Sequence, residues 1–96
     1  MPMPAIAVPT SLTLADARAT IAGWRQALAK VARGGTFELD LSPLARVDSA
    51  AIAALLALAR DARAAGVALS LTGAPTPVRS LARLYGVEPL LFPGAD

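Results

Sequence analysis

Residues 36–60 read TFELDLSPLARVDSAAIAALLALAR, and their pattern changes midway from the period of a strand to that of a helix. Residues 36–41 alternate apolar and polar side chains, which predicts a strand with one buried face. Ser42-Pro43 predicts a turn, and Asp48-Ser49 precedes an alanine- and leucine-rich run that predicts a helix ended by Gly66. A strand, a turn and a helix in this order favour an α/β domain.

The segment before this stretch predicts a strand and a helix. Residues 5–12 are a strand candidate, which Pro9 confines to a sheet edge because proline has no N–H to donate. Residues 13–16 resemble a capping box, so a helix should follow to about Arg33. Apolar residues recur every three or four positions from Leu14 onward, which predicts one buried face on this helix.

The segment after it predicts two more strands and one more helix. Residues 67–72 alternate as a strand, and Thr76-Pro77 should begin a helix that reaches about Tyr85, with Tyr85 pointing inward. Residues 87–92 predict a last short strand. The expected fold is therefore α/β, a small mixed β-sheet of about four strands packed with three helices, in a single domain over residues 1–96.

The composition excludes several classes of function. The 96 residues include neither cysteine nor histidine, which rules out disulfides, the usual zinc ligand sets and a histidine general base. Nine basic and seven acidic residues are spread along the chain and aromatic residues make up 4%, so we predict no nucleic-acid partner. We recognise neither a signal peptide nor an apolar run of the ~20 residues that span a membrane. We therefore expect a cytoplasmic protein without direct membrane insertion and without a cofactor.

Ser49 allows three interpretations at the start of the predicted second helix. As a structural residue, it would cap the helix together with Asp48 by accepting hydrogen bonds from free backbone N–H groups. As a nucleophile it would need a base, but histidine is absent, Lys30 should lie on the exposed side of the first helix, and the G-x-S-x-G pattern is missing. We therefore predict no enzyme. As a docking or phosphorylation site, a phosphate on Ser49 would lie beside Asp48 and could eject a partner.

Two further features suggest a protein partner. The outer face of the second helix should be a smooth strip that another backbone could approach closely, formed by Ala50, Ala53, Ala54 and Ala57. Alanine is also the best helix former, which explains the same strip without a partner. Arg79 and Arg83 lie one turn apart on the predicted third helix, either as solvated surface charge or as contacts for acidic groups of a partner.

Residues 39–91 resemble a STAS domain, the fold of bacterial anti-sigma factor antagonists. That family carries a strand, then Asp-Ser-Ser/Thr-Gly, then a helix, and Ser49 stands where its regulatory phosphoserine lies. The STAS subunits of Mla phospholipid-transport systems look like V-D-[ST]-A-G-L-A-x-L-L. Residues 47–56 match that pattern with Ala51 in place of glycine and Ile52 in place of leucine, and residues 81–85 match the ending L-A-[KR]-L-Y. The best-matching part is 36–91.

The resemblance implies a non-enzymatic accessory subunit that binds the ATPase of a phospholipid-transporting ABC complex, supports its assembly and activity, and so helps to maintain lipid asymmetry. Such a subunit lies at the inner face of the inner membrane through its partner. Its expected contact residues are Asp48, Ser49, Ala50, Ala53, Ala54, Ala57, Arg79 and Arg83. The alternative is an anti-sigma factor antagonist that an anti-sigma kinase regulates by phosphorylating Ser49, although Ala50 replaces the second hydroxyl residue of that branch.

Overall fold

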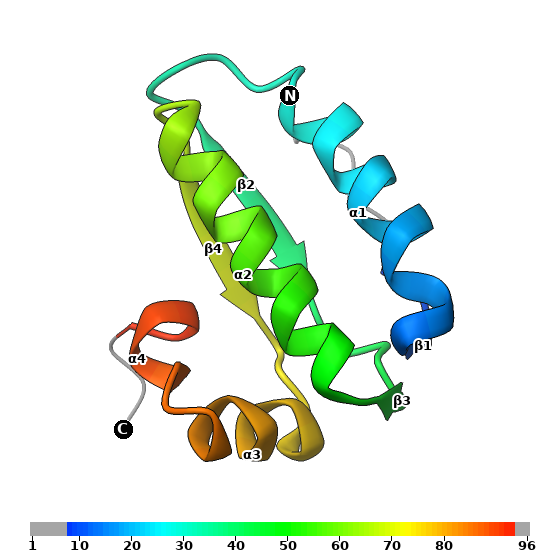
Figure 1. Cartoon of the computed structure of the whole chain (residues 1–96). Helices are drawn as coiled ribbons and strands as arrows, with labels where there is room; N and C mark the ends of the chain where they lie inside the picture. The colour runs from blue at the N-terminus through cyan, green and yellow to red at the C-terminus, as the bar shows by residue number, and fades with distance from the viewer. Residues whose placement is uncertain (1–7, 94–96) are drawn as a thin grey trace.

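The computed structural model describes residues 8–93 and confirms an α/β fold (Figure 1). The elements follow one another as β1 (Ser11–Leu12), α1 (Leu14–Leu28), β2 (Thr36–Asp40), β3 (Arg46–Val47), α2 (Ser49–Ala64), β4 (Ala68–Thr72), α3 (Thr76–Leu84) and α4 (Glu88–Leu91). The strands and helices that the sequence predicts most clearly, β2, α2 and β4, have the expected bounds to within one residue.

The four strands form two parallel pairs in place of one mixed sheet. β2 pairs with β4 over five positions, from Thr36 opposite Ala68 to Asp40 opposite Thr72. β1 pairs with β3 over two positions, with Ser11 opposite Arg46. Each pair joins strands on either side of a helical crossover, which is the connection that parallel pairing requires.

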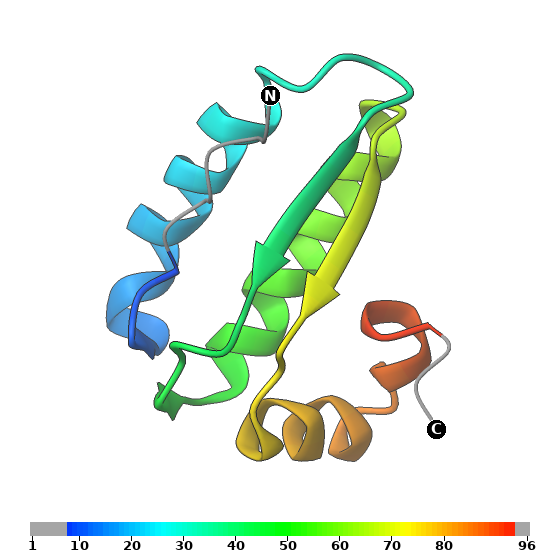
Figure 2. The same cartoon turned by 180° about the vertical axis from the view of Figure 1, so that it is seen from behind.

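The helices lie on one side of the β2–β4 pair. α2 crosses one face of the two strands, α1 lies beside α2, α3 lies beyond the C-terminal ends of the strands, and α4 lies on the side of β4 (Figure 1). No described helix covers the opposite face (Figure 2). The β2 side chains of that face, those of Thr36, Glu38 and Asp40, are exposed, as the alternating pattern predicts.

A single apolar core fills the space between these helices and strands. Every buried residue within 8–93 is apolar, and the largest fully buried side chains come from β1, β2, the loop after β2, α2 and α3. The predicted inward residues Phe37, Leu39 and Leu41 are each at most 1% exposed. The core therefore holds α2 tightly and fixes the position of its N-terminus.

The first helix is shorter than predicted. α1 ends at Leu28, not near Arg33, because Trp24 and Leu28 are its last buried side chains. Beyond them the N–H groups of Lys30 and Val31 donate to carbonyls three residues back, which tightens the chain into turns. The strand candidate at residues 5–12 is also reduced to Ser11–Leu12 among the described residues, and its positions 5–7 lie outside them.

The end of the chain differs most from the prediction. Residues 88–91 form the short helix α4 where a last strand was expected. Pro89 explains the difference, since proline cannot donate to a strand ladder but fits the first turn of a helix. Leu91 and Phe92 are then buried against the core. Tyr85, predicted to point inward, is 52% exposed because α3 ends at Leu84 and the chain turns away.

Candidate docking surface

The site is built around Asp48, which joins the N-termini of α1 and α2. One oxygen of its carboxylate, Oδ1, accepts a hydrogen bond from the Ala50 N–H at 2.8 Å, so Asp48 is the N-cap of α2. The other oxygen, Oδ2, accepts one from the Leu14 N–H at 3.2 Å, at the first residue of α1. A negative charge is favourable at both positions, because helix N-termini carry free N–H groups and partial positive charge.

A second carboxylate, that of Asp16, organises the start of α1. Its Oδ2 atom accepts hydrogen bonds from the Ser11 hydroxyl at 2.8 Å, the Thr13 hydroxyl at 2.9 Å and the Thr13 N–H at 3.1 Å. The Thr13 N–H bond confirms the predicted capping box. The Ser11 hydroxyl, followed by the two Thr13 donors and the charge of Arg46, lowers the pKa of Asp16 from its usual range. The start of α1 is thus tied both to β1 and to α2.

The loop that leads from β2 to β3 is fixed by Asp40. Its carboxylate accepts hydrogen bonds from the Ser42 N–H and the Ser42 hydroxyl, both at 3.0 Å. Gly73, after β4, lies so close that a Cβ there would be 2.5 Å from Asp40 Oδ1, and its φ of +65° lies in the left-handed region that favours glycine. This packing sets the path into β3 and hence the position of the residues that follow it.

Leu14, Ser49 and Ala53 together form what we call the Ser49 surface. The Ser49 side chain is exposed at the first turn of α2, and Ala53 is exposed one turn later on the same side. Leu14 is 80% exposed, and its N–H contacts the carboxylate of the residue that precedes Ser49. An exposed leucine on one helix start and two small exposed residues on the other offer a partner an apolar contact and a surface that it can approach closely.

The sequence reasoning missed Leu14 as a surface residue. It placed Leu14 at the start of the buried stripe of α1, whereas the described residues that are buried on this helix are Trp24 and Leu28. The reason is the place of Leu14 in α1: it is the first residue of the helix, whereas the buried residues Trp24 and Leu28 lie in its second half. No local signal identifies it, because the residue that its backbone contacts, Asp48, lies 34 positions later in the sequence.

The predicted alanine strip of α2 is only partly on the surface. Ala53 is exposed, Ala50 and Ala57 are half-buried, and Ala54 is fully buried, so its assignment to the outer face was wrong. The reason is α1, which packs along α2 and whose Arg25 Nε donates to Asp61 Oδ2 at 2.8 Å. Ala54 lies two turns before Asp61 on the same side of α2. The alanines therefore let α1 approach closely, and only Ala53 stays fully available to a partner.

Arg79 and Arg83 contact residues near the end of the chain. The Arg79 guanidinium lies 5.1 Å from the centre of the Phe92 ring, which is a cation–π distance. Arg83 pairs with Glu88 of α4 at 3.3 Å, and the Arg83 side chain is 71% exposed. An ion pair this exposed contributes little to stability. Arg83 is therefore accessible to a partner, while Arg79 is half-buried.

Two kinds of feature, a metal-binding cluster and a membrane-spanning helix, are absent from the described residues. Within residues 8–93 no three acidic side chains gather in a way that could hold a metal ion. None of the helices in this range is both long enough and apolar enough to cross a membrane. The arrangement at the Ser49 surface is one of exposed small and apolar side chains on rigid helix starts, which suits contact with another protein.

Comparison with known protein families identifies the chain. A family model described as “Mlab, STAS domain” matches residues 4–92, and comparison with curated proteins gives no match. STAS domains generally serve as non-catalytic accessory domains that contact other proteins, and the α/β fold with an exposed serine at the start of α2 agrees with this family. The chain therefore belongs to the STAS domain family and resembles MlaB.

Proposed function

We propose that this chain is an accessory subunit that binds the ATPase of a phospholipid-transporting ABC complex through the Ser49 surface. The observation that carries the proposal is that Leu14 and Ser49 are both exposed, on two helix starts that the Asp48 carboxylate joins. The family match supports it, because the MlaB-like pattern covers nearly the whole chain. The ATPase would hold the chain at the inner face of the inner membrane and would itself bind nucleotide.

The geometry suits a docking contact. Leu14 would be the apolar anchor, and burying a leucine that is largely exposed contributes about 1.5–3 kcal/mol before the costs of association. Ser49 and Ala53 are small and lose little side-chain entropy when a partner covers them. Asp48 uses its two oxygens within the molecule, so its role is to position Leu14 and Ser49. Arg83 is a further exposed contact on α3.

The test is co-purification of the ATPase with variants of the Ser49 surface. Ala53→Arg places a long charged side chain at an exposed position of the surface and should abolish recovery of the ATPase while the domain stays folded. Ala64→Arg is the matched control, because Ala64 is also exposed on α2 but lies at its opposite end. Full recovery of the ATPase by a folded Ala53→Arg variant would show that the partner binds elsewhere.

The exposure of Ser49 also favours a second candidate, an anti-sigma factor antagonist switched by phosphorylation. A phosphate on Ser49 would add about −1.5 to −2 charges next to the Asp48 carboxylate, which already accepts the Ala50 N–H. Repulsion between the two anions would disturb both helix starts and push a partner away. This candidate requires a serine kinase among the co-purified proteins and a phosphorylated fraction in the intact mass spectrum of the chain from its own cells.

A further inference from the structure

We propose that the free edge of β4 binds an extended, acidic segment of a partner protein, which adds to the sheet as a third strand. This site is separate from the Ser49 surface and does not depend on the proposed transport function. Three features of the molecule support this site: the unpaired edge of β4, two grooves along that edge and the charge of the residues that line the grooves.

Among residues 8–93, the backbone of β4 is paired on one side only. Its sheet contains β2 and β4 alone among the described strands. The Ala68 N–H donates to the Gly35 carbonyl at 2.9 Å, and the Leu41 N–H donates to the Thr72 carbonyl at 2.7 Å. Because groups along a strand alternate in direction, Ser70 also faces β2, whereas the N–H and C=O groups of Leu69 and Leu71 face away. Such an edge is a template for another strand.

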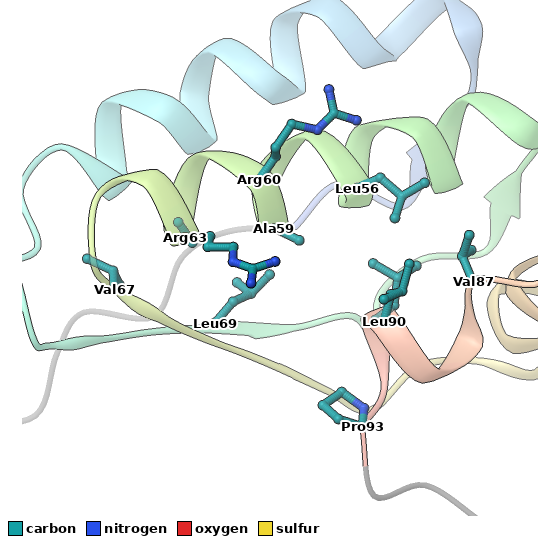
Figure 3. A pocket seen from close by; sticks show the side chains of 11 residues that line it. Leu56, Ala59, Arg60, Arg63, Val67, Leu69, Val87, Leu90 and Pro93 are labelled. Atoms are coloured by element: carbon teal, nitrogen blue, oxygen red, sulfur yellow. The ribbon is translucent and has the colours of Figure 1, made fainter.

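Two grooves lie along this edge and share Leu69. The larger, of about 600 Å³, lies between α2, β4 and α4 and is lined by apolar side chains that include Leu56, Val87 and Leu90 (Figure 3). The smaller, of about 270 Å³, lies beside Leu71 and Phe92. Leu90 is 69% exposed at the rim of the larger groove. An added strand needs pockets of this kind, because its alternate side chains point toward one face of the sheet.

The charges in the grooves indicate which segment would fit. The charged residues that line them are all arginines, namely Arg60 and Arg63 in the larger groove and Arg79 in the smaller one. Figure 3 shows the Arg63 guanidinium directed into the groove, while Arg60 points away from it. An acidic segment with alternating apolar residues complements this lining. Edge-to-edge pairing of two copies would instead bring arginines of like charge together, so a second copy is disfavoured as the occupant.

Phage display tests this site. A library of random peptides of about twelve residues is selected for binding to the full chain. We expect the enriched peptides to alternate aliphatic residues and to carry Asp or Glu. The tightest-binding peptide is then synthesised and added to the chain. It should slow the hydrogen exchange of the Leu69 and Leu71 amides, followed by NMR, by about tenfold or more. The Ser70 amide should not change, because it already faces β2. This alternation is a signature that binding at another surface would not give.

The matched variants test the charge. Arg63→Glu should weaken peptide binding by about tenfold, since it replaces an attraction by a repulsion in the groove. Arg18→Glu changes an exposed arginine of α1 outside the grooves and should change the affinity by less than about twofold. The proposal is overturned by a selection without enrichment, by protection of other amides, or by equal binding of the Arg63→Glu variant. It is also overturned if the free chain dimerises with Leu69 and Leu71 protected.

Discussion

The two strand pairs of this domain are stabilised by different interactions. The β2–β4 pair has five paired positions and a buried apolar face that α2 covers. The β1–β3 pair has only two positions, and the structure around it is held by the hydrogen bonds of Asp16 and Asp48. The β2–β4 pair supplies more of the apolar core, whereas the β1–β3 pair adds Leu12 to that core and lies among the hydrogen bonds that position the Ser49 surface. Changes in the two regions should therefore differ in size and in kind.

The largest effect on stability is expected where α2 packs against α1. Ala54 is fully buried, so Ala54→Arg would force a charged side chain between α1 and α2 and should lower the free energy of unfolding by more than about 4 kcal/mol. Urea unfolding followed by the fluorescence of Trp24, which is 2% exposed, measures this loss. Ala53→Arg, one residue earlier but exposed, should change the same free energy by less than about 0.5 kcal/mol. Similar losses for both variants would contradict the helix orientation.

An intermediate effect on stability is expected at the starts of α1 and α2, which Asp48 joins. Asp48→Ala removes the N-cap of α2 and the partner of the Leu14 N–H, and it should lower the free energy of unfolding by about 1–2 kcal/mol. Asp48→Asn keeps an acceptor for the Ala50 N–H and loses only the charge, which should cost about 0.3–1 kcal/mol. The same unfolding assay checks both. If Asp48→Ala left the free energy of unfolding unchanged, the starts of α1 and α2 would not depend on this carboxylate.

The smallest effect is a dependence on pH. The pKa of Asp16 is lower in the folded state than its usual value of about 3.9, chiefly because of the Ser11 hydroxyl. Its contribution to stability is therefore fully present above that value and is lost as the pH falls through the folded pKa. Between pH 6 and pH 3, the urea midpoint of the wild type should fall further than the urea midpoint of Asp16→Asn. Ser11→Ala should reduce this difference, and an equal loss in wild type and Asp16→Asn would rule out the linkage.

Sequence patterns predicted the parts of the fold that depend on regular burial. The alternation in residues 36–41 and 67–72 and the long apolar run of α2 specify their elements locally, and all three are confirmed. Ala54 could not be placed correctly, because a helical pattern shows which face is apolar but not that a second helix covers a neighbouring face. The strand expected at residues 87–92 was wrong for a local reason, Pro89, whose preference for a first helical turn outweighed the apolar composition.

The candidate site was predicted in part. Asp48 and Ser49 were recognised at the start of α2, and the structure confirms Asp48 as the N-cap and Ser49 as exposed. Leu14 was missed because its neighbour in space, Asp48, is 34 residues away along the chain. The arginines on α3 were assigned to the surface, but the cation–π contact of Arg79 with Phe92 depends on the unexpected path of the last residues.

The hydrogen bond between Leu14 and Asp48 has a consequence for folding kinetics. It closes a loop of 34 residues, and both strand pairs also join distant parts of the chain, so the entropy of loop closure must be overcome before these contacts form. A nascent chain shorter than about 50 residues lacks one half of the Ser49 surface altogether. A partner that binds there consequently selects chains that have completed folding, and by mass action it keeps them folded.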